Sequence, residues 1–290
     1  MKLPDFEFKS PTTVEEAVAM LMEADGEAKL LAGGQSLLPV MAFRLAAPAV
    51  LVDLARVAAL KGIRVDERGV RIGAMTTWRD IEDDQRLKTA APLVSAAIEY
   101  IAHYQIRNRG TIGGSLSHAD PSAEMPGVVV TCDALLEVAS SDGTRLVPAD
   151  EFFQGPLTTC LEPAEILTAV HFPLWSARRL WAFEEFAQRR GDFAYAGIAL
   201  HYDTSAKGAI EDAHVGLIGA TSVPRRLAVA ETALNGRQLD EATIAAAARA
   251  ASAAAEAEDD IHASGAYRRS LVGTLVERAL IAASIRAVAA

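Results

Sequence analysis

The chain has 290 residues and a formal net charge of −10, with 51% hydrophobic and 23% charged residues. The acidic excess argues against nucleic-acid binding, because phosphate recognition needs a concentrated basic surface. The two cysteines, Cys132 and Cys160, are far apart, so we expect no iron–sulfur cluster or structural zinc within this chain. No run approaches the roughly 20 apolar residues of a membrane span, and the N-terminus lacks a signal-peptide pattern, so a cytoplasmic protein is expected.

Residues 1–57 are predicted to form a small α/β unit. Thr13 and Glu16 fit a capping box, which favours a helix over the apolar positions that follow. The apolar runs 28–32 and 50–54 are typical of buried strands. The expected order is β-α-β-loop-β, with a Gly-Gly turn at the carboxyl end of the second strand, where ligands commonly bind to an α/β sheet.

Residues 58–175 are predicted to form a second, strand-rich α/β unit. Alternating residues around a glycine indicate a β-hairpin at 63–73, and 91–104 is expected to be one continuous helix. The apolar run 128–132 is interpreted as a strand. Further strands are expected at 134–138, 145–147 and 165–172.

Residues 178–290 are predicted to form a third unit, in which an antiparallel sheet has one face covered by helices. The expected strands are 181–187, 194–202 and 213–219, and the expected helices are 240–255 and 267–283. The whole chain is therefore expected to be α+β, with two α/β subdomains that precede a C-terminal α+β domain.

Two glycine turns, far apart in the chain, carry the chemistry. Gly33-Gly34-Gln35-Ser36 follows the second expected strand, and Gly113-Gly114-Ser115 lies inside the turn-rich segment 107–124. Glycine lets the backbone approach a ligand and turn its N–H groups toward it, and Ser and Thr hydroxyls add short donors. If both turns face one cleft, they would clamp the diphosphate of a dinucleotide, although each alone also fits an ordinary tight turn.

Several polar or aromatic residues near these turns have two readings. Asp120 and Glu124 could bind a ribose, because carboxylates commonly accept hydrogen bonds from ribose hydroxyls in dinucleotide sites. Alternatively, Asp120 starts a turn and Glu124 is a solvated or capping acid. His118 suits either a ligand contact or a hydrogen bond within the turn. Tyr195 could place its ring over a flat cofactor, although its spacing alone favours a position in the hydrophobic core.

The common catalytic and nucleotide motifs are missing from the sequence. No GxGxxG, Walker, HExxH or GxSxG pattern occurs, and the six histidines show no metal-ligand spacing. We therefore expect no catalytic or metal-binding residue of the chain's own. The pattern favours a protein that holds a cofactor, which supplies the chemistry.

In motif order, nearly the whole chain resembles the FAD-binding medium subunit of molybdenum hydroxylases, the carbon monoxide dehydrogenase and xanthine dehydrogenase type. The motifs that carry this resemblance are Ala-Gly-Gly-Gln-Ser-Leu-Leu-Pro at 32–39, Arg-Gly-Thr-Ile-Gly-Gly-Ser at 109–115, Ala-Asp-Pro at 119–121 and Arg-Gly-Asp-Phe-Ala at 190–194.

The resemblance implies two subdomains that bind FAD between them, with both glycine turns at the pyrophosphate. It implies donation from Ser36, Thr111 and Ser115, an acid for the ribose at Glu124, and a flavin-facing aromatic at Tyr195. The remaining positions implied at the cofactor are Ala32, Gly33, Gly34, Gln35, Leu37, Gly113, Gly114, His118, Ala119, Asp120 and Leu167.

Two positions depart from the family pattern. Gln35 stands where many members have His, and Glu185 stands where many have Lys. The second departure removes any cationic contact to the flavin from that position.

The implied function is electron relay within a heterotrimer. A molybdopterin-binding large subunit hydroxylates the substrate, a small subunit with two [2Fe–2S] clusters passes the electrons on, and FAD in this chain delivers them to a final acceptor. The resemblance also implies a dimer of heterotrimers. Two alternatives remain open: a stand-alone flavin oxidase of the same superfamily, which predicts turnover by the isolated chain, and a scaffold subunit without flavin.

Overall fold

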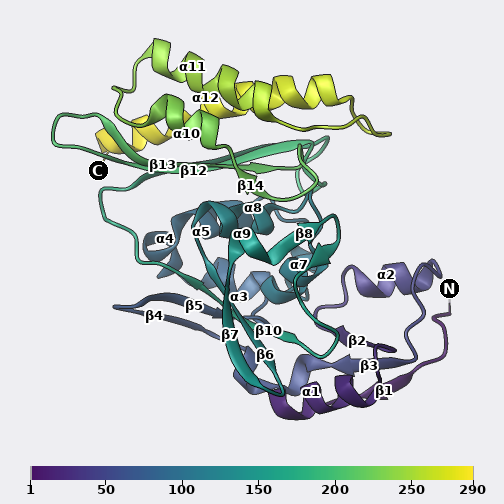
Figure 1. Ribbon diagram of the computed structural model, residues 1–290. Coiled ribbons are helices and arrows are strands. Elements are labelled where there is room, and N and C mark those ends of the chain that lie inside the picture. Colours follow the sequence, from purple (N-terminus) through teal and green to yellow (C-terminus); the bar gives the residue numbers. More distant parts are fainter. Residues whose placement is uncertain (1, 290) are drawn as a thin grey trace.

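The computed structural model describes residues 2–289, so the outermost residues of the predicted first and third units, 1 and 290, lie outside the described part. The strands form sheets of three, five, four and two strands, and helices lie on the larger sheets (Figure 1). The predicted α+β fold, with an antiparallel C-terminal sheet covered by helices, is confirmed. Within residues 2–289, no helix combines the length and apolarity needed to cross a bilayer.

The N-terminal sheet is parallel and has the strand order β1-β3-β2. Its elements are β1 (Glu7–Lys9), α1 (Val14–Glu23), β2 (Ala28–Leu31), α2 (Leu37–Ala42) and β3 (Val50–Asp53). The Thr13 half of the predicted capping box is present, since Thr13 accepts a hydrogen bond from the Glu16 N–H group, whereas the Glu16 carboxylate accepts from the Thr12 N–H group instead of that of Thr13. The first glycine turn lies between β2 and α2, and two 3-10 turns (Leu54–Arg56 and Ala58–Leu60) lead onward.

The five-stranded sheet is antiparallel, with the order β4-β5-β10-β6-β7. Its strands are β4 (Ile63–Asp66), β5 (Gly69–Gly73), β6 (Leu135–Ser140), β7 (Gly143–Pro148) and β10 (Ile166–Phe172), and a small hairpin is made by β8 (Phe153–Gly155) and β9 (Thr158–Thr159). The predicted hairpin at 63–73 is confirmed as β4 and β5.

One face of this sheet is covered by short helices. They are α3 (Trp78–Asp83), α4 (Leu87–Ala90), α5 (Pro92–Ile98), α6 (Tyr104–Arg107), α7 (Ile112–His118), α8 (Glu124–Thr131) and α9 (Ala149–Phe152). The largest core cluster forms between them and the sheet, with Ile72, Leu93, Val128 and Leu136 among its members.

Three predictions in this region need correction. The strand predicted at 128–132 is wrong, because this run belongs to helix α8, whose eight residues are all buried; a helix that is apolar all round reads like a buried strand. The helix predicted at 91–104 is interrupted after Ile98, and Ala102 has a positive φ of 43°. The segment 107–124, interpreted as turns, contains helix α7 and places the second Gly-Gly pair in its first turn.

The C-terminal sheet is antiparallel, with the order β11-β12-β13-β14. Its strands are β11 (Leu180–Phe186), β12 (Ala196–Thr204), β13 (Ile210–Ile218) and β14 (Arg225–Arg226), and its helices are α10 (Ala228–Leu234), α11 (Glu241–Ala254) and α12 (Gly265–Ala289). These helices cover one face of the sheet, and α8 packs against the other (Figure 1).

Helix α8 joins the two larger sheets through close backbone packing. A methyl group built on Gly127 would overlap the Ile218 side chain of β13, and one built on Gly216 would overlap the Thr131 hydroxyl. The Thr131 carbonyl oxygen also accepts from two buried histidines, His201 Nε2 at 3.1 Å and His214 Nδ1 at 2.9 Å. These contacts fix the C-terminal sheet to α8, the helix that follows α7 and its glycine pair in the chain.

Candidate functional site

The two glycine turns, distant in the chain, lie against each other. A methyl group built on Gly33 would overlap the carbonyl oxygen of Arg109, two residues before Thr111. One built on Gly114 would lie 3.3 Å from the Ala32 Cβ atom. Gly33 therefore needs glycine for the approach of one main chain to the other, whereas Gly114 lies tightly against side-chain atoms, and the turns meet at one place.

The first turn has a row of uncommitted N–H groups. Among the described residues 2–289, the amide nitrogens of residues 33–36 donate no hydrogen bond to a protein acceptor. Gly34 has a φ of +73°, and the Gln35 side-chain amide donates to the Gly33 carbonyl oxygen at 3.0 Å, which braces the turn. Ser36 precedes α2 without a side-chain cap bond. Adjacent uncommitted amides suit an anion with several oxygens.

The second turn differs from the expectation, because its glycine amides bond within the protein. Gly113 donates to the Ala74 carbonyl oxygen at 2.8 Å, and Gly114 donates to the Thr111 hydroxyl oxygen at 3.1 Å. These bonds start helix α7, with Thr111 as its N-cap. Thr111 keeps its hydroxyl hydrogen for another acceptor, and the half-buried Ser115 adds a second hydroxyl on the same helix.

The residues after α7 form a tight connection to α8. Ala119 ends α7 in a left-handed conformation (φ 52°), and the Asp120 carboxylate accepts from the Ser122 N–H group at 2.9 Å. The turn interpretation of Asp120 is thus supported by its geometry. Glu124 begins α8 and is only 6% exposed, which rules out the reading of it as a solvated acid.

Glu124 has a buried carboxyl neighbour on the C-terminal sheet, Glu185 of β11. Burial raises the pKa of Glu124. Burial also raises the pKa of Glu185, and the nearby Glu124 carboxylate adds to that effect. The Glu185 Oε2 atom is buried and has no hydrogen-bond partner among the described residues. A neutral carboxylic acid at Glu185 is therefore favoured beside Glu124.

The other predicted site residues lie in different surroundings. Leu167 is 3% exposed and belongs to the core, next to a bulge in β10, so any ligand contact there would involve its main chain. His118 is the last residue of α7 and is half-buried. Tyr195 is half-buried at the start of β12, and its hydroxyl donates to the Gln188 side chain at 3.2 Å.

The contact of Arg268 with Tyr195 was not predicted from the sequence. Arg268 is a buried residue in the first turn of α12. Its guanidinium carbon lies 5.5 Å from the Tyr195 ring centroid. An arginine on a helix is usually exposed to solvent, and the sequence around Arg268 gives no sign of its contact with Tyr195. Ala74 was also missed, because it acts through its carbonyl oxygen alone.

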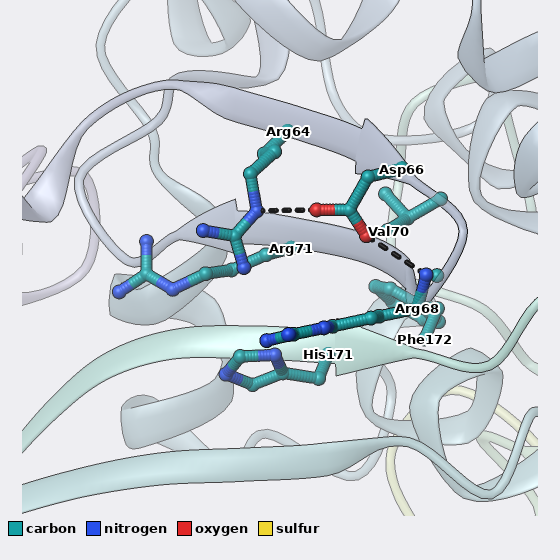
Figure 2. A pocket seen from close by; sticks show the side chains of 8 residues that line it. Arg64, Asp66, Arg68, Val70, Arg71, His171 and Phe172 are labelled. Carbon is teal, nitrogen blue, oxygen red and sulfur yellow. Dashed lines mark hydrogen bonds and ion pairs between the residues drawn. The ribbon is translucent and has the colours of Figure 1, made fainter.

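A separate hollow lies on the outer face of the five-stranded sheet (Figure 2). Arg64 there pairs with Asp66 at 2.9 Å, and Arg71 and His171 each lie 2.8 Å from a Glu137 carboxylate oxygen. Its lining comes from β4, β5, β10 and the β4–β5 turn, without the glycine turns. Most of its positive charge is already paired with carboxylates, so it is a weaker candidate for an anionic ligand.

Comparison with known proteins identifies the family of the chain. Residues 4–175 match the family described as the FAD binding domain in molybdopterin dehydrogenase, and residues 181–283 match the carbon monoxide dehydrogenase flavoprotein C-terminal domain. The chain is 41% identical to the nicotine 6-hydroxylase medium subunit of Paenarthrobacter nicotinovorans, over 99% of this chain and 100% of that one.

The similarity extends to carbon monoxide dehydrogenases. The chain is 36% identical to the medium chain from Hydrogenophaga pseudoflava, over 98% of both sequences. A solved structure of the dehydrogenase from this organism, lacking the Mo-pyranopterin moiety of its cofactor, superposes with a TM-score of 0.95 at 38% identity and covers 99% of both chains. The chain therefore belongs to the family of FAD-binding medium subunits of molybdenum hydroxylases.

Proposed function

We propose that the chain binds FAD where its two glycine turns meet, and that it relays electrons from [2Fe–2S] clusters of a partner subunit to a final acceptor. The observation that carries this proposal is the contact of Gly33 with Arg109, which brings the two donor-rich turns together. When bound, FAD supplies the redox chemistry. The chain's own task is to hold and orient it.

The donors at the junction fit a diphosphate. The N–H groups of residues 33–36 offer hydrogen bonds from the first turn, and the hydroxyls of Thr111 and Ser115 offer them from the second. Together they would surround phosphate oxygens with fixed dipoles without needing a lysine. This division of labour, with amides on one side and hydroxyls on the other, replaces the symmetrical pair of amide turns expected from the sequence.

Other residues are assigned by the roles that the family resemblance implies for them. Glu124 is proposed to accept hydrogen bonds from the ribose, with its carboxylate in a buried setting that strengthens such bonds. Tyr195 is proposed to place its ring against the isoalloxazine. Ala32, Leu37, His118, Ala119, Asp120 and the Leu167 main chain are proposed to line the remainder of the cofactor site.

The proposal includes the wider assembly and the division of the chain. We propose a dimer of heterotrimers with a molybdopterin-binding large subunit and a [2Fe–2S] small subunit, in the cytoplasm. Within the chain, 1–57 and 58–175 act as the two FAD-binding subdomains, and 178–290 is the C-terminal domain. Sizing the co-expressed complex by light scattering tests the assembly, and a mass near one heterotrimer would reject the dimer.

The test of FAD binding uses the complex with both partner subunits. Gly33→Ala adds a methyl group that would overlap the Arg109 carbonyl oxygen and push the turns apart. Its FAD affinity is expected to fall at least about tenfold, or ~1.4 kcal/mol. Gly155→Ala is the matched control, because its methyl group would meet Thr158 only at an ordinary 3.7 Å.

Three results would reject the proposal or change it. Wild-type complex without flavin bands would favour the scaffold alternative. Equal FAD affinity in Gly33→Ala and wild type would mean that the turn junction does not hold the cofactor. Turnover of substrate by the isolated chain would favour the stand-alone oxidase.

A further inference from the structure

Arg268 is a buried cation without a role in the function proposed above. It lies in the first turn of α12 and is 5% exposed. Its Nη1 atom donates to the carbonyl oxygens of Tyr195 at 2.8 Å and Gly219 at 2.9 Å. Its Nη2 atom donates to the Asp260 carboxylate at 2.6 Å. One guanidinium therefore connects α12 to the main chain beside the paired strands β12 and β13.

Asp260 is a fixed anchor for this guanidinium. Its Oδ1 atom accepts from the N–H groups of His262 at 2.8 Å and Ala263 at 2.9 Å, which leaves Oδ2 for Arg268. Those backbone bonds, with a contribution from Arg268, lower the pKa of Asp260 to about 2. The carboxylate is thus ionised at neutral pH, and the charge-assisted bond holds the guanidinium plane in place.

The Tyr195 ring lies beside the same cation. The Arg268 guanidinium carbon is 5.5 Å from the ring centroid, within the range of a cation–π contact. The Phe186 and His262 rings lie 6.1 and 6.3 Å away, and the Tyr195 hydroxyl donates to Gln188. Arg268 contacts both the main chain and the ring of Tyr195, as does Phe186, whose carbonyl oxygen accepts from the Tyr195 N–H group at 2.8 Å; Arg268 is the charged one of the two.

We infer that Arg268 is a positioning residue, which fixes the main chain and ring of Tyr195 in the one orientation that receives the isoalloxazine. This inference rests on the proposed FAD-binding function. A planar guanidinium with several donors in a fixed fork suits this task, because it bonds to two carbonyls and a carboxylate while its charge faces the ring. Lysine in its place offers a single point charge and cannot keep all of these contacts.

The first test needs no flavin. The FAD-free chain is labelled with ¹³C on its tyrosine rings, and the Tyr195 signal among the five tyrosines is identified by its loss in Tyr195→Phe. In Arg268→Met the Tyr195 ring signal is expected to shift and broaden. In Arg269→Met, a matched loss of a guanidinium whose hydrogen-bond partner among the described residues is the Ala257 carbonyl oxygen, it is expected to stay unchanged. An unchanged Tyr195 signal in Arg268→Met overturns the inference.

The second test is a double-mutant cycle in the complex with the partner subunits. Arg268→Met and Tyr195→Ala are each expected to weaken FAD binding by about tenfold and to alter the visible circular dichroism of the flavin. The double variant is expected to lose no more than Tyr195→Ala alone. Losses that multiply to about a hundredfold, or a flavin spectrum unchanged in Arg268→Met, would overturn the inference.

A milder variant covers the case in which Arg268→Met does not fold. Arg268→Lys keeps a buried cation for Asp260 and is expected to show an intermediate loss of FAD affinity, which disappears in the Tyr195→Ala background. A loss that persists in that background contradicts the inference. If wild-type complex takes up no FAD, the proposed function fails, and the ring signal in the FAD-free chain still decides the role of Arg268.

Discussion

At the residue scale, the buried pair Glu124 and Glu185 links the candidate site to the stability of the chain. Glu185 has a raised pKa in the folded chain, so the unfolded chain releases this proton first as the pH rises above about 4.5. The stability that this group provides is fully present below that pH and is lost progressively at higher pH. A neutral carboxylic acid at Glu185, next to the carboxyl group proposed to bind the ribose, thus costs stability at neutral pH.

The Glu185→Gln variant tests this cost. The amide has nearly the same shape and cannot ionise, so the FAD-free variant is expected to unfold about 2–4 °C higher than wild type at pH 8, and at the same temperature at pH 4. Thermal unfolding followed by circular dichroism gives both values. Glu184→Gln is the control on the same strand, since Glu184 only pairs with the exposed Arg278. Equal pH profiles for wild type and Glu185→Gln would contradict the assignment.

At the element scale, helix α8 determines how the glycine-turn region meets the C-terminal sheet. It begins at Glu124 and packs along β13, where Gly127 lies against Ile218. Alanine has a helix propensity about 1 kcal/mol better than glycine, so propensity alone predicts that Gly127→Ala is stabilising. Packing predicts the opposite, because the added methyl group would overlap the Ile218 side chain.

We expect packing to prevail at Gly127. Gly127→Ala should lower the free energy of unfolding by about 1–3 kcal/mol, measured by urea denaturation of the full chain. Gly155→Ala, at the half-buried end of strand β8 with room for a methyl group, should be close to neutral. A Gly127→Ala chain more stable than wild type would mean that α8 and β13 are less closely packed than described.

The same helix shows why some elements were predictable and others were not. The β4–β5 hairpin has clear alternation in its sequence, because one of its faces is covered and the other is less so, whereas the C-terminal strands β12 and β13 are buried along most of their length and were indicated by their apolar runs. In α8 every residue is buried, so its apolar run carries no helical period. The Gly113-Gly114 pair resembles a turn, and only the cap bond from Thr111 and the contact with Ala74 make it the start of a helix.

At the scale of the whole molecule, the buried histidines on the C-terminal sheet fix that sheet to α8. Burial, with a contribution from the neighbouring His214 and Arg179, lowers the pKa of His201 to about 2. The folded chain keeps His201 neutral, whereas the unfolded chain takes up a proton below pH 6.5. The stability from this group is therefore present above that pH and is lost as the pH falls.

The His201→Leu variant should flatten this acid side of the profile. It loses the bond to the Thr131 carbonyl oxygen, so at pH 7 it should be less stable by about 1 kcal/mol, while its stability should fall less steeply between pH 6.5 and pH 4. Urea denaturation across this pH range measures both effects. A wild-type slope in His201→Leu would contradict the assignment.

Individual contacts between residues of distant segments could not be predicted from the sequence. The motifs indicated two glycine turns with one shared ligand, and the predicted order of strands and helices was largely right. The contact of Gly33 with Arg109, the pairing of Glu124 with Glu185 and the reach of Arg268 to Tyr195 each join parts of different sheets or helices. Such contacts depend on how the sheets pack, which no local pattern of residues encodes.

The most direct test of this account is the position of FAD in crystals of the complete complex. We expect difference density for the diphosphate at the junction of the two turns, within hydrogen-bonding distance of the N–H groups of residues 33–36 and of the Thr111 hydroxyl. Diphosphate density at another place, for example in the arginine-lined hollow on the outer face of the five-stranded sheet, would contradict it.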